Sequence, residues 1–144
     1  MYKQSNPSTK YKLKVDRICW HRDVALCSTS GDQEKPVHNS IERQPKAIKM
    51  QQDIKILGFP AYSTGQSHYI ADSKIAKIYP QNGVNKFEIA HSIRSGNSGG
   101  PIIDNESKVV GVVLEGATKD SGNNGCLEIE EIDKLFTSDD YIIK

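Results

Sequence analysis

A serine stands among glycines in the segment GNSGGP, residues 96–101, and this combination suits a nucleophile. A hydroxyl that attacks a carbonyl group must be exposed on a tight turn, where backbone N–H groups can converge on the oxyanion that forms. Glycines adopt the unusual backbone angles of such a turn and leave room for a substrate chain. The segment therefore predicts acyl-transfer chemistry at Ser98, and the alternative is a glycine-rich surface turn with an ordinary serine.

The residues on both sides of this segment have the patterns of β-hairpins. Residues 101–103 and 109–114 are two apolar runs separated by a short polar turn, which is a hairpin signal. Residues 74–79 and 86–91 alternate with a period of two on either side of a turn that contains Asn and Gly. Residues 53–60 also alternate, and this run ends at a glycine and a proline. Several short strands of this kind favour an all-β barrel.

The GNSGGP segment and its flanking strands resemble the nucleophile loop and second barrel of the trypsin-like serine peptidases, which include the chymotrypsin, HtrA-like and V8-like groups. The resemblance implies an all-β fold with a complete second β-barrel, remnant strands of a first barrel and a short C-terminal helix. It also implies that Ser98 is the nucleophile and that the N–H groups of Gly96 and Ser98 form the oxyanion hole. The implied activity is that of a serine endopeptidase, which hydrolyses peptide bonds through an acyl-enzyme.

Asp23 is the candidate for the acid of a catalytic triad. It is followed directly by a Val-Ala-Leu strand, and this is similar to the family's "D-[IVL]-A-[LV]-L" segment. In the family, a buried aspartate accepts a hydrogen bond from the base histidine and holds its tautomer. The separation from Ser98 is 98 − 23 = 75 residues, which is plausible for such a pair. An aspartate at the start of a strand is common, so the assignment depends on the serine loop.

The resemblance also maps substrate-binding residues onto the chain. The family's strand after the nucleophile hairpin pairs with the substrate backbone, and this function falls on Leu114, Glu115 and Gly116. The floor of the specificity pocket lies six residues before the nucleophile, at Ser92. With Val113, this serine predicts a modest, uncharged pocket, and a preference for Lys or Arg has no support.

The base histidine of the family has no counterpart in this sequence. In the family the chain order is His, Asp, Ser, with the histidine several tens of residues before the acid. Only His21 precedes Asp23, and it is too close, although residues i and i+2 of a strand share a face. His38, His68 and His91 follow the acid and have no motif around them. None of the four is predicted as the general base.

Three explanations of the missing base stay open. The chain is a fragment of a longer peptidase, or a degenerate relative that binds peptides without cutting them, or one component that needs a partner chain to supply the histidine. A serine hydroxyl without a base is a poor nucleophile at neutral pH. The sequence therefore predicts little or no peptidase activity for this chain alone. The alternative function is an inactive peptide-binding module.

The length suits about one barrel and part of another. At 144 residues the chain can bury a sizeable core, whereas a complete two-barrel peptidase needs more. Near the C-terminus, apolar residues at i, i+3, i+6 and i+7 predict a short amphipathic helix through Ile129, Ile132, Leu135 and Phe136. The predicted organisation is a remnant of the first barrel with the triad acid (1–30), a linker (31–47), the second barrel with the nucleophile loop (48–136) and a tail (137–144).

Composition limits the possible partners and cofactors. Nineteen basic and 18 acidic residues nearly balance, so the total charge implies neither nucleic acid nor a membrane surface as a partner. No apolar stretch approaches the length of a membrane span. Acyl transfer of this type needs no cofactor, and no residues have metal-ligand spacing. The expected partners are a polypeptide substrate and the missing first barrel or a partner chain that carries the base.

The cysteines bear on the cellular compartment. Cys19, Cys27 and Cys126 are odd in number and have no metal-like spacing, so they are interpreted as buried free thiols of a reducing compartment. The N-terminus lacks the apolar segment of a secretory signal. A cytoplasmic location is therefore expected.

Overall fold

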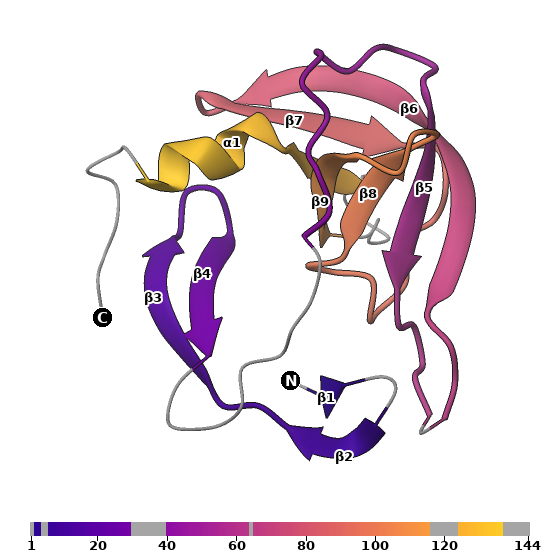
Figure 1. Cartoon of the computed structure of the whole chain (residues 1–144). Helices are drawn as coiled ribbons and strands as arrows, with labels where there is room; N and C mark the ends of the chain where they lie inside the picture. Colours follow the sequence, from indigo (N-terminus) through magenta and orange to yellow (C-terminus); the bar gives the residue numbers. More distant parts are fainter. Residues whose placement is uncertain (1, 4–5, 30–39, 64, 116–123, 137–144) are drawn as a thin grey trace.

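The computed structural model has one closed β-barrel and, beside it, a separate β-hairpin (Figure 1). Two short strands, β1 (Tyr2–Lys3) and β2 (Asn6–Lys10), form a further two-stranded sheet near the N-terminus. The structure describes residues 2–3, 6–29, 40–63, 65–115 and 124–136.

Six antiparallel strands close the barrel in the order β10-β7-β6-β5-β8-β9. The all-β fold with a short C-terminal helix, expected from the sequence, is therefore confirmed. The barrel strands are β5 (Asp53–Gly58), β6 (Tyr69–Gln81), β7 (Val84–Ile89), β8 (Pro101–Asp104), β9 (Val109–Glu115) and β10 (Gly125–Glu128).

Both predicted hairpins are present in the barrel. Strands β6 and β7 join through Asn82 and Gly83, whose φ angles of 52° and 76° are typical of the two-residue turn that suits the twist of a hairpin. Strands β8 and β9 pair with Ile102 opposite Gly111. The local patterns of the sequence therefore gave the correct strand pairs.

The barrel interior is filled by apolar side chains from alternate strand positions. Gly111 on β9 leaves space for the ring of Phe87, because a Cβ at this glycine would lie 2.6 Å from the Cε1 atom of that ring. The same Cβ would lie 2.5 Å from the carbonyl oxygen of Leu127. Any larger residue at Gly111 would therefore displace the core. The core cluster consists of Ile54, Ile56, Ile75, Phe87, Ile89, Ile102, Val110, Val113 and Cys126.

A two-stranded sheet of β3 (Leu13–Cys19) and β4 (Val24–Thr29) lies apart from the barrel strands. Cys19 pairs with Val24 across its turn. Strand β4 agrees with the strand predicted directly after Asp23. Apolar side chains on this hairpin are unusually exposed, since Trp20 is 63% and Leu13 46% accessible to solvent.

The chain before the barrel is held against β9. The N–H of Gln44 donates to the carbonyl of Val109 at 2.8 Å, and the N–H of Val109 donates to the carbonyl of Glu42 at 2.8 Å. Arg43 thereby forms a parallel bridge with Val109. The end of the segment predicted as a linker is therefore anchored on the barrel.

The C-terminal helix is short and begins directly after β10. It consists of α1 (Glu130–Asp133) and one 3₁₀ turn, η1 (Lys134–Phe136). Leu135 is buried and Ile132 is half-buried, as the predicted apolar stripe requires. The helix also buries Glu131 completely, which the sequence pattern did not predict.

The cysteine interpretation needs one correction. Cys19 and Cys126 are buried free thiols, but Cys27 is exposed. Cys27 lies on β4, and the barrel does not cover this side of the hairpin. The expectation that all three thiols are buried is therefore wrong for Cys27.

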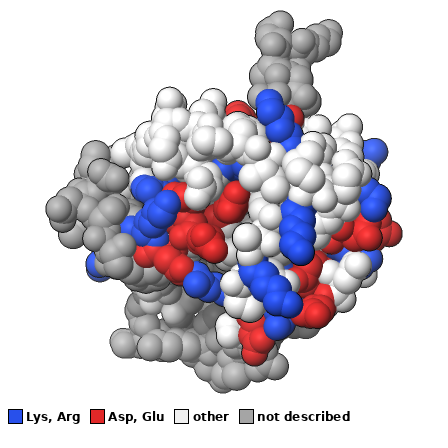
Figure 2. Space-filling model, turned by 90° about the horizontal axis from the view of Figure 1, so that it is seen from above, with Lys and Arg blue, Asp and Glu red and all other residues white. Residues whose placement is uncertain are grey.

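Acidic and basic side chains are interspersed on the face seen in Figure 2, without a large area of one sign. Several of them form surface ion pairs, such as those of Lys55 with Asp72 and Lys74 with Asp53. In the described segments, no helix has the length and apolar character needed to cross a membrane. These segments also contain no group of three or more His, Cys, Asp or Glu that could hold a metal ion.

Candidate active site

The loop between β7 and β8 presents Ser98 to solvent. Gly96 has a φ of +97°, which favours glycine, and a Cβ there would lie 2.5 Å from the carbonyl oxygen of Phe59. The carbonyl of Gly96 accepts the N–H of Phe59 at 3.1 Å. The N–H of Asn97 donates to the carbonyl of Arg94 at 3.0 Å. The loop is therefore a tight turn fixed on the end of β5.

The backbone N–H groups of this loop fall into two sets. Those of Asn97, Gly99 and Gly100 donate to backbone carbonyls at 2.8–3.0 Å. Those of Gly96 and Ser98 have no acceptor in the described part of the chain. Two free donors therefore flank an exposed serine hydroxyl, and such donors are what an oxyanion requires.

The side chain of Asn97 points inward, away from the exposed serine. It is completely buried, and its Oδ1 atom would lie 2.4 Å from a Cβ placed on Gly58. Gly58 is therefore required for the loop to pack. Neither amide atom of Asn97 has a partner among the residues that the structure describes.

Asp23 lies in the turn between β3 and β4. Its φ of +55° is uncommon for a residue with a side chain, and its N–H donates to the carbonyl of Trp20 at 3.3 Å. The carboxylate is exposed, whereas the family resemblance implies a buried one, because the described residues leave this side of the hairpin open.

The structure brings Asp23 and Ser98 to one cavity. Its volume is about 460 Å³, and it lies between the hairpin, the barrel and the C-terminal helix. The remaining lining comes from residues 24–26 of β4, Gly99, residues 112–114 of β9, Ile132 and Leu135.

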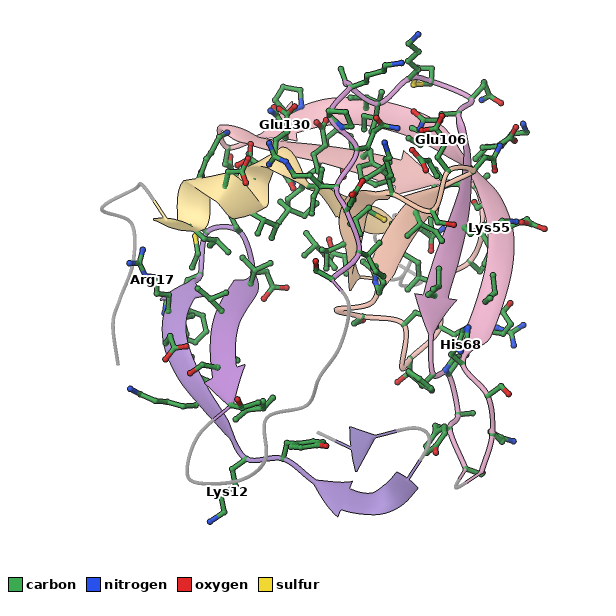
Figure 3. The ribbon with its side chains drawn as sticks, in the orientation of Figure 1. Lys12, Arg17, Lys55, His68, Glu106 and Glu130 are labelled. Carbon is green, nitrogen blue, oxygen red and sulfur yellow. The ribbon has the colours of Figure 1, made fainter. Side chains whose placement is uncertain are left out.

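A second cavity of about 470 Å³ also reaches Ser98. The two cavities share only Ser98 and Gly99. Phe59 forms a wall of the second one and contacts Tyr62 edge to face, with 5.5 Å between the ring centroids. His68 lines the same cavity beside the end of β5 (Figure 3). The sequence analysis missed this aromatic wall, because its residues lie outside the nucleophile motif.

His21, the histidine nearest to Asp23 in sequence, contacts the barrel instead. Its Nε2 atom lies 2.7 Å from the carbonyl oxygen of Asn82, in the β6–β7 turn. His21 does not line the cavity that Asp23 shares with Ser98. It is therefore not placed to accept the serine proton.

Of the other histidines, His68 lines the second cavity but has no hydrogen bond to Ser98 and does not share a cavity with Asp23. The Nε2 atom of His91 lies 3.3 Å from the hydroxyl of Tyr69. His38 lies outside the described residues. In the described segments, therefore, no histidine is paired with the serine or the acid.

The predicted substrate-binding residues are divided between two regions. The N–H of Val113 donates to the carbonyl of Gly100 at 3.0 Å, and the pairing of β9 with the β8 side ends here. Leu114 and Glu115 continue β9 beyond this point. Ser92 is exposed and lines neither of the cavities at Ser98. Gly116 lies outside the described residues.

A buried ion pair joins the turn of the β3–β4 hairpin to helix α1, which follows the last barrel strand. The Nε atom of Arg22 lies 2.8 Å from the Oε2 atom of Glu131, which is completely buried. The other carboxylate oxygen accepts hydrogen bonds from the side chain of Lys134 and, at 3.2 Å, from the N–H of Asn85. Burial alone would raise the pKa of Glu131, but these hydrogen bonds outweigh it and lower the pKa below 4.5. Sequence reasoning missed this pair, because its partners are 109 residues apart.

The family profile of the trypsin-like peptidase domain matches residues 3–112. This chain belongs to that family. The match includes both Asp23 and the whole GNSGGP segment, so the resemblance inferred from these motifs is confirmed. No curated protein sequence matches the chain.

Solved structures of proteases have the same fold. The active form of the Rv3671c protease from M. tuberculosis has a TM-score of 0.72 and 20% identity, over 91% of this chain and 60% of that one. An inactive mutant form has a TM-score of 0.68 and 21% identity, over 91% and 66%. The serine endoprotease from Yersinia pestis has a TM-score of 0.66 and 15% identity, over 88% and 43%. The chain thus spans less than two thirds of the protein in each of these three structures.

Proposed function

We propose that this chain carries the nucleophile and the acid of a serine endopeptidase that hydrolyses polypeptides through an acyl-enzyme. One observation carries the proposal: the exposed Ser98 lines the same cavity as Asp23, and its own N–H and that of Gly96 have no acceptor in the described part of the chain. Family membership supports it, because the matched range, residues 3–112, contains both Asp23 and the GNSGGP segment.

In this proposal, the Oγ atom of Ser98 attacks the carbonyl carbon of the scissile peptide bond while a base takes its proton. The N–H groups of Gly96 and Ser98 donate to the oxyanion. The C–N bond then breaks, and the leaving amine takes the proton from the base. Water, activated by the same base, hydrolyses the acyl-enzyme and restores the serine.

The base comes from outside the residues described here. The site of a base is the cavity between Asp23 and Ser98, where the carboxylate could accept a hydrogen bond from an imidazole N–H. A histidine from a longer form of this polypeptide, or from a partner chain, would complete the site. The hairpin of β3 and β4 has unpaired edges that further strands of a first barrel could join.

The substrate would lie along the end of β9. Leu114 and Glu115 follow the point where pairing with the β8 side ends, so an extended peptide could add there as another strand. By resemblance alone, Gly116 is a candidate for the same substrate-binding function and Ser92 for the floor of the specificity pocket, whereas Val113 lines the cavity at Ser98. On the other side of Ser98, the wall formed by Phe59 would contact residues after the bond.

A fluorophosphonate probe tests the proposal, because its rate of reaction with a serine rises when a base activates the hydroxyl. The purified chain should label slowly at Ser98, and Ser98→Ala should not label. A longer form of the polypeptide, or the chain with its partner, should label at least about a hundredfold faster, as expected when a base is restored.

A His68→Gln variant is the matched control, because His68 lies in the second cavity at Ser98. Unchanged slow labelling of this variant is expected. Rapid labelling of the chain alone that His68→Gln abolishes would contradict an external base. Folded chain that never labels, in any context, would instead favour an inactive peptide-binding module. The specific observation behind that second candidate is that no described histidine is paired with the serine.

A further inference from the structure

We propose that Arg22 and Glu131 are positioning residues, which hold the turn that carries Asp23 over the cavity of Ser98. The inference rests on the proposed function for the role of Asp23, but the attachment of the turn can be tested without any activity. Neither side chain lines that cavity, so both would act through the aspartate.

The ion pair of Arg22 with Glu131 is buried and lies directly beside Asp23 in the sequence. Arg22 is 6% exposed and Glu131 is not exposed at all, and Arg22 directly precedes Asp23. The Nη1 atom of Arg22 also lies 3.6 Å from the Sγ atom of Cys19, at the other end of the turn. The guanidinium therefore contacts both the first residues of the turn and the barrel side.

Two donors other than Arg22 fix the carboxylate of Glu131. Lys134 and the N–H of Asn85 occupy its Oε1 atom and leave Oε2 to Arg22. A carboxylate with each oxygen assigned to a different donor fixes the direction from which the arginine must approach.

Two further contacts tie the same hairpin to the barrel side. Arg17 on β3 donates from Nη1 to the carbonyl of Leu135 at 2.8 Å, and His21 contacts the carbonyl of Asn82 at 2.7 Å. The loop end of the hairpin accordingly lies against α1 (Figure 1), with Arg17 on the strand below it (Figure 3). The three contacts surround the turn that contains Asp23.

Stability alone does not account for such a pair. Replacing a buried ion pair with well-packed apolar residues is often neutral or stabilising, so the pair adds orientation more than free energy. An isolated two-stranded hairpin is at best marginally stable in water. Because β3 and β4 pair only with each other in the described residues, contacts outside the strand pairing must help to orient the turn, and the pair of Arg22 with Glu131 is the buried one next to Asp23.

The first measurement needs no activity and uses Trp20, which is the only tryptophan and lies in the same turn. In the full chain, Arg22→Met should lower the time-resolved anisotropy of Trp20, because the turn is released. Arg43→Met is the matched control, since it removes an exposed ion pair of the same helix, with Asp133. Unchanged Trp20 anisotropy in folded Arg22→Met would overturn the proposal. If Arg22→Met does not fold, Glu131→Gln and Arg22→Lys provide the same comparison.

The second measurement links the turn to Asp23. Free imidazole serves as the base, and its acceleration of fluorophosphonate labelling at Ser98 is measured in a double-mutant cycle. Arg22→Met should reduce the acceleration about tenfold when Asp23 is present, because small misplacements of catalytic groups are costly. In an Asp23→Asn background it should have less than about a twofold effect. Equal losses in both backgrounds would mean a purely structural role and would overturn the proposal.

Together, the two measurements distinguish failure of the proposed function from failure of the positioning role of Arg22. If neither free imidazole nor a longer form of the polypeptide accelerates labelling of Ser98, the proposed function fails, while the Trp20 comparison still decides whether Arg22 holds the turn. If acceleration occurs but the cycle is additive, the proposed function stands and the positioning role fails.

Discussion

The Nε2 atom of His21 lies 2.7 Å from the carbonyl oxygen of Asn82, so the histidine nearest to Asp23 in sequence is hydrogen-bonded to the β6–β7 turn of the barrel. A ring in this position braces the β3–β4 turn against the β6–β7 turn. Its role is therefore attachment of the hairpin rather than proton transfer.

Substitution of His21 by alanine should leave the chemistry of the serine unchanged. Because the contact is an exposed hydrogen bond, His21→Ala should lower the free energy of unfolding by less than about 1 kcal/mol. The imidazole-assisted labelling rate at Ser98 should stay within about twofold. Urea unfolding and probe labelling measure the two quantities, and loss of labelling without loss of stability would identify His21 as the base.

Alanine at Gly96 should damage the nucleophile loop. The substitution meets both a φ of +97° and the carbonyl oxygen of Phe59 at 2.5 Å from the new Cβ. The expected loss is about 1–3 kcal/mol of unfolding free energy, together with loss of probe labelling.

Gly83→Ala is the matched control for that change. Gly83 also has a positive φ, 76°, but nothing lies within 4 Å of a Cβ built there. It should cost about 1–2 kcal/mol from the backbone alone and leave labelling intact. Similar losses of labelling in both variants would show that general destabilisation, and not the geometry of the nucleophile loop, determines the reactivity of Ser98.

Acid should weaken the link between hairpin and barrel. Burial would raise the pKa of Glu131, but the hydrogen bonds from Lys134, Arg22 and Asn85 produce a net lowering below 4.5. A carboxylate with a lowered folded-state pKa contributes stability that is present above its unfolded-state pKa and is lost as the pH falls through the folded one. The stability difference between the unchanged chain and Glu131→Gln should therefore narrow as the pH falls below about 4.5. Urea midpoints from pH 7 to pH 3 measure this difference, and a constant difference would contradict the prediction.

Free imidazole should act as a replacement base. The cavity of about 460 Å³ between Asp23 and Ser98 is large enough for the ring, so labelling at Ser98 should rise with imidazole concentration and then saturate. Saturation indicates binding, whereas a linear rise would indicate only solution catalysis. Asp23→Asn should remove most of the rise, because the ring would lose the acceptor that orients it.

The three thiols should differ sharply in reactivity. Cys27 is exposed, whereas burial, together with the nearby carboxylate of Glu88, raises the pKa of Cys126. Because the thiolate is the reactive form, one thiol should react rapidly with a disulfide reagent at pH 8 in the folded chain, and all three in denaturant. Cys27→Ser should remove the rapid phase, and its persistence would mean that a buried thiol becomes exposed.

Local patterns predicted five of the six barrel strands and the serine loop, because those signals lie within a few residues of each other, but they did not predict β10. The hairpin of β6 and β7 is specified by alternation and by Asn82-Gly83 at its turn. The nucleophile loop is specified by glycines at positions where a side chain would collide or require a positive φ.

The rest of the site depends on contacts between distant segments, which local patterns do not contain. A glutamate in a helix is ordinarily a surface residue, so nothing near Glu131 predicted its burial by a partner 109 residues away. The aromatic wall at Phe59 joins a strand end to the nucleophile loop only after the barrel closes. The exposure of Asp23 likewise follows from which strands cover the hairpin, not from its own sequence.

The separation of Arg22 and Glu131 along the chain determines when the turn that carries Asp23 can be fixed during synthesis. The turn with the aspartate leaves the ribosome first, and the glutamate that we propose to hold it follows 109 residues later. A nascent chain can therefore expose the serine before its acid has been oriented, and the two can be aligned only after Glu131 has been made. For a peptidase, this delay would keep a half-made molecule from cutting its neighbours.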